Sequence, residues 1–200
     1  MKLDLSAMTG TSFDFENLPQ SGANYFVSLV FPNTVQIIGC AGWFSFTSLT
    51  SVSASNVKTI SDGAFTSCSS LISVSFPAVT TIGTSAFSFC KSLESISLPN
   101  ATSIGNGAFG YCKNLASVSL PEAITIGDVA FSHCESLTSI NLPAATTIGN
   151  YAFSFSESLS SVSLPAATTI GNGAFSSCKS LTSISLPAAI PSVNVRTLPT

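Results

Sequence analysis

Hydrophobic residues recur along the chain at an interval of 22 positions. One set of leucines, one set of isoleucines and one set of phenylalanines each keep this interval over most of the sequence. The phenylalanines are Phe65, Phe87, Phe109, Phe131, Phe153 and Phe175. A repeat of about 20 to 29 residues is typical of a solenoid, in which each repeat forms one coil and buries its apolar side by stacking on its neighbours.

Each repeat contains a short segment in which apolar residues alternate with serine. In the last repeat, Ile184 stands between Ser183 and Ser185. A period of two places apolar side chains inward and hydroxyl groups outward from a β-strand. A proline such as Pro187 follows soon after, and because proline cannot donate to a ladder, the strand is expected to end there. The sequence predicts a parallel sheet with one strand per coil.

The part of the repeat that follows an Ile-Gly pair predicts a different structure. In six repeats the next position holds a short polar residue, although Ser61 replaces the glycine in the first of them. The set is Asp62, Thr84, Asn106, Asp128, Asn150 and Asn172. Such side chains cap helices by accepting hydrogen bonds from backbone N–H groups two or three residues on. We therefore expect a short helical or 3-10 turn on the convex side, opposite a concave sheet, with Phe and the Cys three residues later on its inner side.

The repeats predict a single domain with irregular ends. Residues 27–187 carry the repeats, although Trp43 and Phe46 replace Phe and Cys in an early copy. Residues 1–26 match only through Leu3 and Leu5 and are expected to form an N-terminal cap region, and residues 188–200 a C-terminal tail or cap. Irregular terminal repeats are typical of solenoids, because a regular end would expose the core.

Composition narrows the classes of partner. Of the 200 residues, 45% are hydrophobic, only 8% are charged and 38 are serine, whereas ordinary domains carry roughly 25% charged residues. The net charge of −3 with this apolar content excludes disorder. No basic patch for nucleic acid or anionic lipid is present, and no apolar run reaches the ~18 residues of a transmembrane segment. Residues 1–6 lack the apolar stretch of an export signal.

The repeat unit L-x-S-[IV]-x-L-P-x-A-x-x-I-G-x-x-A-F-x-x-C-x-S resembles the BspA-like, or Treponema-type, leucine-rich repeats of bacterial surface proteins. Ile104-Gly105, Ala108-Phe109 and Cys112 match this signature in register, and the resemblance covers about residues 27–186. Units of that family commonly have 23 residues, one more than most units here. The resemblance implies a leucine-rich-repeat solenoid of a secreted or cell-surface protein, extracellular or in the periplasm, that takes part in adhesion to host proteins or other bacteria.

The cysteines predict no chemistry. Five of the six occupy one repeat position, namely Cys68, Cys90, Cys112, Cys134 and Cys178. Coils ~4.8 Å apart hold their Cβ atoms too far apart for disulfides, so we expect buried, reduced thiols that act as small hydrophobic side chains. Cys40, the odd thiol, is expected to be exposed. His133 next to Cys134 should point away from it, and no metal or cofactor site is predicted.

Two surfaces are candidate binding sites. The first is formed by the outward strand residues Ser73, Ser75, Ser95, Ser97, Ser117, Ser119, Ser139, Asn141, Ser161 and Ser163. Solenoids bind partners on such extended surfaces, but serine is also a simple solvated filler of a strand, and this surface lacks the aromatic and Arg residues of usual hot spots.

The second candidate lies two positions after the conserved Phe of each repeat unit. It consists of Phe89, Tyr111, His133 and Phe155 in consecutive repeats. An exposed apolar ridge of this kind marks a contact site, whereas a ridge covered by a neighbouring loop would only close the core. We predict that Phe89 and Phe155 are at least partly exposed. Oppositely charged residues two positions further on, such as Lys113 and Glu135, should pair across coils with ~0 to 1 kcal/mol each.

These observations predict a non-enzymatic surface or secreted module for protein–protein interaction or adhesion. The partner is another protein or a host macromolecule. The alternative is a structural protein that self-associates through the solenoid ends or a flank, which its low charge would favour.

Overall fold

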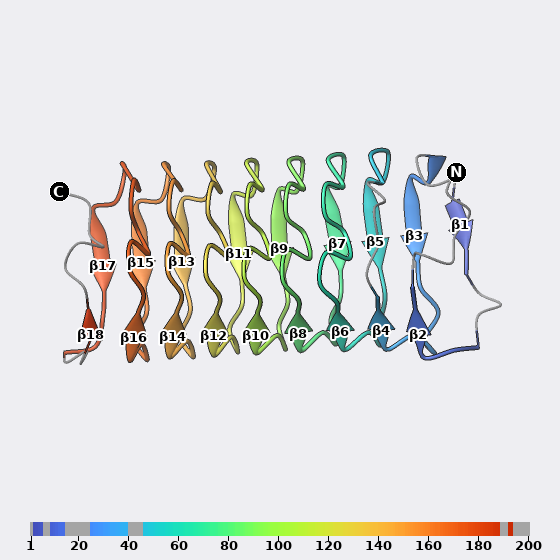
Figure 1. Cartoon of the computed structure of the whole chain (residues 1–200), viewed down its shortest axis with the longest axis horizontal. Coiled ribbons are helices and arrows are strands. Elements are labelled where there is room, and N and C mark those ends of the chain that lie inside the picture. Colours follow the sequence, from blue (N-terminus) through green and yellow to red (C-terminus); the bar gives the residue numbers. More distant parts are fainter. Residues whose placement is uncertain (1, 6–8, 15–24, 40–45, 189–191, 194–200) are drawn as a thin grey trace.

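The computed structural model describes residues 2–5, 9–14, 25–39, 46–188 and 192–193. The chain winds into a parallel β-solenoid whose coils lie side by side, so that the termini lie at opposite ends of the rod (Figure 1). The predicted solenoid with parallel stacked strands is confirmed. Cys40 and Trp43, which entered the sequence analysis, lie outside the described residues.

The serine-flanked segments form three-residue strands, as the period of two predicts. They are β1 (Lys2–Asp4), β3 (Ser28–Val30), β5 (Ser51–Ser53), β7 (Ser73–Ser75), β9 (Ser95–Ser97), β11 (Ser117–Ser119), β13 (Ser139–Asn141), β15 (Ser161–Ser163) and β17 (Ser183–Ser185). Each paired strand stands parallel to the same segment of the next coil, for example Ile96 opposite Val118. Hydrogen-bonded pairing runs through β1-β3-β5-β7, β9-β11 and β13-β15-β17. The prolines follow the strand ends, as expected.

A second ladder of two-residue strands runs the length of the rod. It joins β2 (Ser12–Phe13), β4 (Ile37–Ile38), β6 (Thr59–Ile60), β8 (Thr81–Ile82), β10 (Ser103–Ile104), β12 (Thr125–Ile126), β14 (Thr147–Ile148), β16 (Thr169–Ile170) and β18 (Ser192–Val193) into one nine-stranded sheet. The sequence analysis did not predict this ladder, because two residues are too few to display an alternation.

The segment after each Ile-Gly pair is not a helix, contrary to the prediction. In the described coils it forms consecutive turns, in which alternate N–H groups bond within the coil and to the next coil. The Ser88 and Cys90 N–H groups bond three residues back, to Ser85 and Phe87, whereas the Phe89 N–H bonds to the Gly110 carbonyl of the next coil. Half of the donors that would build a helix therefore hold neighbouring coils together.

The polar residue after Ile-Gly bridges two coils and does not cap a helix. The Asn106 Oδ1 accepts the Asp128 N–H at 2.8 Å, and the Asp128 Oδ1 accepts the Asn150 N–H at 2.7 Å. The preceding glycine makes this approach possible: a Cβ on Gly105 would lie 2.6 Å from the Gly83 carbonyl carbon of the previous coil. The Ile-Gly-Asx pattern is thus a signal for coil stacking.

The conserved phenylalanines form a single buried spine through the solenoid. Rings of neighbouring coils stack with centroids 5.2 to 5.5 Å apart, for example Phe87 on Phe109 at 5.3 Å and 1°. Offset parallel stacking at this spacing is favourable beyond simple burial. Each coil therefore contributes one ring to a core that it cannot complete alone.

Irregular segments continue the ladders at both ends. β1 pairs with β3, β2 with β4, and β18 with β16. The register between β3 and β5 is 23 residues, because the copy that begins at Phe31 is one residue longer. The division into residues 1–26, 27–187 and 188–200 stays a prediction.

Candidate functional site

The outward residues of the three-residue strands form an exposed polar surface, here called the strand face. Of the ten predicted residues, nine are exposed and Ser163 is half-buried. From β7 to β17, within the described part of the chain, their side chains form no hydrogen bond to the protein. The face therefore offers a row of hydroxyl groups to solvent, and no aromatic side chain stands among them.

The consecutive turns form a second surface, here called the turn face. Two positions of each turn have a left-handed backbone. The first is occupied by Gly63, Ser85, Gly107, Val129, Tyr151 and Gly173, and the second by Ser67, Phe89, Tyr111, His133, Phe155 and Ser177. Left-handed φ costs non-glycine residues roughly 1 kcal/mol or more and is rare for bulky ones. The large side chains at these positions, such as Phe89, Val129 and Tyr151, are exposed.

Four residues at the second position stack into a continuous aromatic ridge, Phe89, Tyr111, His133 and Phe155. Successive ring centroids are 4.6, 4.4 and 4.6 Å apart, and the rings are parallel within 11°. Phe89 is 40% exposed and Phe155 is 43% exposed. The predicted exposure is confirmed, and the alternative, in which a loop covers the ridge, is wrong.

The ridge presents ring edges to solvent. Because each inner ring stacks on its two neighbours, its faces are covered, and only the outer faces of Phe89 and Phe155 are left. Cations and nucleobases bind aromatic faces, and sugar C–H groups pack against faces in the same way. Edges suit apolar side chains and carbonyl oxygens, because the edge carries the positive end of the ring quadrupole.

Buried serines lie between the two left-handed positions. Ser88, Ser132 and Ser154 are less than 10% exposed, and the Ser132 and Ser154 hydroxyls are hydrogen-bonded at 2.9 Å. Equivalent residues in coils without a ridge residue, Thr66 and Ser176, are half-buried. Buried serines therefore stand next to Phe89, His133 and Phe155 in their coils, whereas the coil of Tyr111 has Gly110 at this position.

Sequence reasoning missed Val129 and Tyr151, which stand beside the ridge at the first left-handed position. They are 40% and 50% exposed. A signal was available: the same repeat position holds Gly63 and Gly107, and glycine at a recurring position indicates a left-handed backbone. A pocket of about 340 Å³ opens on the same face, lined by Ser85, Ser88, Gly107, Gly110, Tyr111, Val129 and Ser132.

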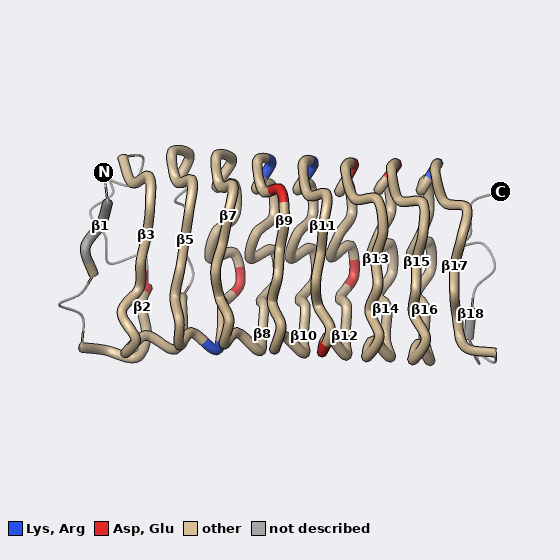
Figure 2. Tube along the Cα trace, turned by 180° about the vertical axis from the view of Figure 1, so that it is seen from behind, with Lys and Arg blue, Asp and Glu red and all other residues tan. Residues whose placement is uncertain are grey.

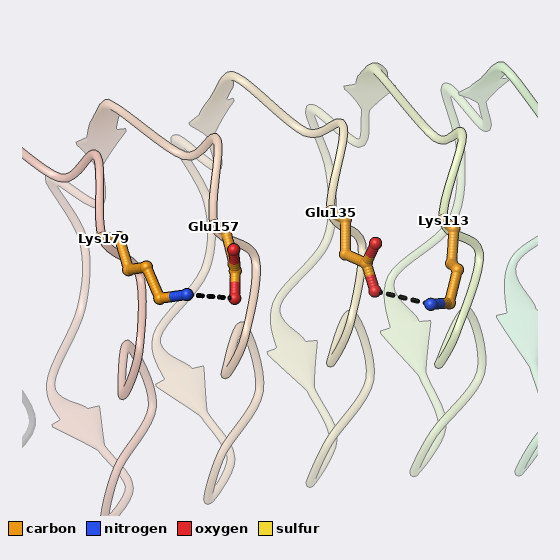
Figure 3. A network of polar contacts seen from close by, with 4 residues as sticks. All are labelled: Lys113, Glu135, Glu157 and Lys179. Carbon is orange, nitrogen blue, oxygen red and sulfur yellow. Dashed lines mark hydrogen bonds and ion pairs between the residues drawn. The ribbon is translucent and has the colours of Figure 1, made fainter.

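Charged residues are sparse along the rod (Figure 2). One row follows the ridge, where Lys113 Nζ lies 2.8 Å from Glu135 Oε1, and Lys179 Nζ lies 2.7 Å from Glu157 Oε1 (Figure 3). Both predicted pairs are confirmed. The hydrogen bond from Lys113 to Glu135, and then the carboxylate charge, raise the pKa of Lys113 above its ordinary value.

The cysteine ladder is buried and reduced among the described residues. The thiols of Cys90, Cys112, Cys134 and Cys178 each donate to a phenylalanine carbonyl of the previous coil, for example Cys112 Sγ to Phe87 O at 3.1 Å. Ser156 takes one place in the ladder and donates to Phe131 O at 3.0 Å. Burial raises the pKa of Cys112 to about 12, which holds it in the unreactive thiol form.

The residues that could have suggested catalysis are kept apart. His133 lies on the outward ridge and Cys134 points into the core. In the described part of the chain, no three His, Cys, Asp or Glu side chains gather as metal ligands would. No helix there is long and apolar enough to span a bilayer.

The stacked parallel strands, the buried phenylalanine spine and the leucine positions define a leucine-rich-repeat solenoid. A family model described as "BspA type Leucine rich repeat region (6 copies)" matches residues 21–125 and 102–198. The chain belongs to this BspA-type family, and the resemblance inferred from its repeat is confirmed.

Solved structures of bacterial leucine-rich repeat proteins share this fold. A leucine-rich cell surface protein from Faecalibacterium prausnitzii is 24% identical, with a TM-score of 0.64 over 93% of this chain and 69% of that one. The leucine-rich repeat protein of T. pallidum is 26% identical, with a TM-score of 0.58 over 86% of this chain and 78% of that one. No curated protein matches the sequence significantly.

The predicted site residues fall into two groups on different segments of each coil. The strand serines and Asn141 form the strand face, and the four ring-bearing residues form the turn face. The structure does not join them into one site.

Proposed function

We propose that this chain is a non-enzymatic module of a bacterial surface protein that binds another protein through its turn face. The observation that carries the proposal is the exposed ridge of Phe89, Tyr111, His133 and Phe155 on strained backbone. Exposed contiguous apolar surface marks contact sites, and aromatic residues are enriched at interface hot spots.

The orientation of the rings favours a protein partner. With the inner faces covered, a sugar, cation or nucleobase finds no stacking surface along the ridge. Apolar side chains and backbone carbonyls of a protein fit the exposed edges. Membership of the BspA-type repeat family and likeness in fold to a protein described as a cell surface protein fit a location outside the cell.

The strand face is the second candidate surface for the same function. Its free hydroxyls would let a partner backbone approach closely, but it lacks large side chains that a partner could desolvate. For that reason we consider the strand face a weaker candidate for the binding surface than the ridge.

Retention experiments test the proposal. The immobilised protein is exposed to extracts of bacterial surface proteins and host matrix proteins, alongside the variant Phe89→Ser/Phe155→Ser. The matched control is Ile72→Ser/Ile124→Ser, which removes two isoleucines of similar exposure, 45% and 47%, outside the turn face. We expect a retained protein to be lost with the ridge variant only. Equal retention by both variants would contradict the proposal, as would an unaltered protein that is monomeric and retains nothing.

Self-association is the second candidate function. Its support is the order of charges beside the ridge, which runs Lys91, Lys113, Glu135, Glu157. This order reverses in sign when read backward, as a surface that binds its own copy requires.

A further inference from the structure

The row of charges beside the ridge is self-complementary. Over four coils it reads positive, positive, negative, negative at Lys91, Lys113, Glu135 and Glu157, and the next coil adds Lys179. Within these four coils the reversed row carries the opposite charge at every place. Lys113 pairs with Glu135 and Lys179 with Glu157 inside the chain, whereas Lys91 forms no ion pair with any described residue.

The first left-handed position is complementary in size along the same four coils. It reads Ser85, Gly107, Val129, Tyr151, which is two small residues followed by two large ones. Read in reverse, each large residue falls opposite a small one. The pocket of about 340 Å³ lies at the small end, lined by Ser85 and Gly107 among others, where it could receive the large side chains of a reversed copy.

One buried hydroxyl group in this pocket lacks a partner. Ser88 is 7% exposed, and no described residue forms a hydrogen bond with its side chain. The neighbouring coil has Gly110 at the equivalent position, so the serine contact seen between Ser132 and Ser154 is not repeated there. Because Ser88 lines this pocket, its hydroxyl can bond to water or to a polar group that enters the pocket.

The ridge has the same two-fold pattern. Its ends are the apolar rings Phe89 and Phe155, and its centre holds the polar rings Tyr111 and His133. In the reversed order, phenylalanine meets phenylalanine and tyrosine meets histidine. The tyrosine hydroxyl can donate to a neutral imidazole nitrogen.

We propose that the partner bound by the turn face is a second copy of this chain, docked antiparallel about a two-fold axis between the coils of Tyr111 and His133. This inference rests on the proposed function, because it names the occupant of the ridge. The axis lies in the interface and is perpendicular to the rod, so the coil order is reversed while each column faces its own equivalent. Ridge meets ridge and charge row meets charge row in one isologous contact.

All contacts form together, because both copies have the same coil spacing. Lys91 faces Glu157 of the second copy, and Val129 and Tyr151 enter the pocket region of the second copy near Gly107 and Ser85. The Tyr151 hydroxyl of one copy then lies near the pocket of the other copy, which the Ser88 hydroxyl lines. These four coils at ~4.8 Å each give a contact about 20 Å long, so we expect a weak dimer of the transient class.

Charge reversal at Lys91 and Glu157 tests the register. The two residues are three coils apart in one chain, at ~14 Å, and form no ion pair with each other. Sedimentation equilibrium over a concentration series should show dimerisation of the unaltered protein. Lys91→Glu alone and Glu157→Lys alone each place like charges opposite each other twice, and each should weaken the dimer about tenfold or more.

An equimolar mixture of the two single variants provides the matched control. A mixed dimer would carry two attractive contacts, so association should return to the unaltered level in the mixture while each variant alone stays weak. Folding defects cannot produce this recovery. A protein that is monomeric over the whole series overturns the proposal, as does dimerisation unaffected by either variant.

These results separate the two proposals. A monomeric protein that retains another protein through the ridge leaves the proposed function standing and overturns the second copy as its partner. A monomeric protein that retains nothing overturns both.

Discussion

The strand face and the turn face are built by the same repeat, but they use serine in opposite ways. On the strand face, serines such as Ser117 and Ser119 are exposed, and the ladder beneath them is made by backbone groups. On the turn face, Ser132 and Ser154 are buried and bonded to each other. Side chains are therefore replaceable on one face and structural on the other.

The difference also concerns the backbone. Strand residues adopt the extended conformation that suits any side chain, whereas the turns hold bulky residues at φ near 60°, for example Tyr111 at 61° and Val129 at 49°. Strain of this kind persists only where the surrounding structure enforces it and is concentrated at functional positions. This contrast favours the turn face as the contact surface.

The largest change in the free energy of unfolding is expected at the glycine that precedes the turn. Gly105→Ala places a Cβ 2.6 Å from the Gly83 carbonyl carbon, and relief requires movement of two coils. We expect a loss of about 3 kcal/mol in the free energy of unfolding, measured by urea denaturation. Ser119→Ala on the strand face should change it by less than about 0.5 kcal/mol. Similar effects of the two substitutions would remove the contrast between the faces.

The second prediction replaces serine by alanine on both faces. Ser154→Ala leaves the buried Ser132 hydroxyl without its partner and should cost about 1 to 2 kcal/mol. Ser161→Ala, on the exposed strand face, should be nearly neutral. The double variant Ser132→Ala/Ser154→Ala should recover part of the loss, because no buried hydroxyl is then left unpaired. A neutral Ser154→Ala would show that the buried serine pair is not structural.

The third prediction concerns whether a glycine substitution raises or lowers the free energy of unfolding. Val129→Gly relieves left-handed strain at φ 49° and should raise the free energy of unfolding by about 0.5 kcal/mol, because strain relief exceeds the entropy cost of glycine. Ser117→Gly, in an extended strand, should lower it by about 0.5 to 1 kcal/mol. Thermal unfolding of both variants measures the two signs. Destabilisation by both would mean that Val129 is unstrained.

The smallest effect is expected at the charge row that borders the turn face. Glu135→Gln should lower the pKa of Lys113 toward its ordinary value of 10.5, because the raised pKa arises from the hydrogen bond and charge of Glu135. The raised pKa means that the stabilisation is present below the ordinary lysine pKa and is lost as the pH rises through the folded value. NMR titration of the Lys113 side chain measures the shift. Ser119→Ala should leave that titration unchanged.

Much of the interior was predictable because its signals repeat. Phenylalanine recurs at one interval in six consecutive coils, from Phe65 to Phe175, and the stacking of these rings in a single spine follows from one coil placed on the next. The outward direction of Ser95 and the inward direction of Cys112 follow from local periods of two and three residues. The pairing of Lys113 with Glu135 needed only the coil spacing.

The turn segment was not predictable in the same way. Asn106 reads locally as a helix cap, but its carboxamide oxygen accepts from Asp128 in the next coil. A helix and these turns share the bond three residues back, for example Cys112 N–H to Phe109 O. The turns form in place of a helix because alternate N–H groups bond to carbonyls of the next coil. Local helix propensity does not include these bonds between coils.

The sequence by itself determined the solenoid, the buried phenylalanine spine and which residues make up the strand face, the ridge and the charge row. Each of these depends on residue type at a fixed interval. Only the tertiary structure decided that the second turn position is left-handed, and that Phe89, Tyr111, His133 and Phe155 stack edge-outward there. The physical reason is that backbone groups of adjacent coils compete with local hydrogen bonds, and that competition exists only once the coils are stacked.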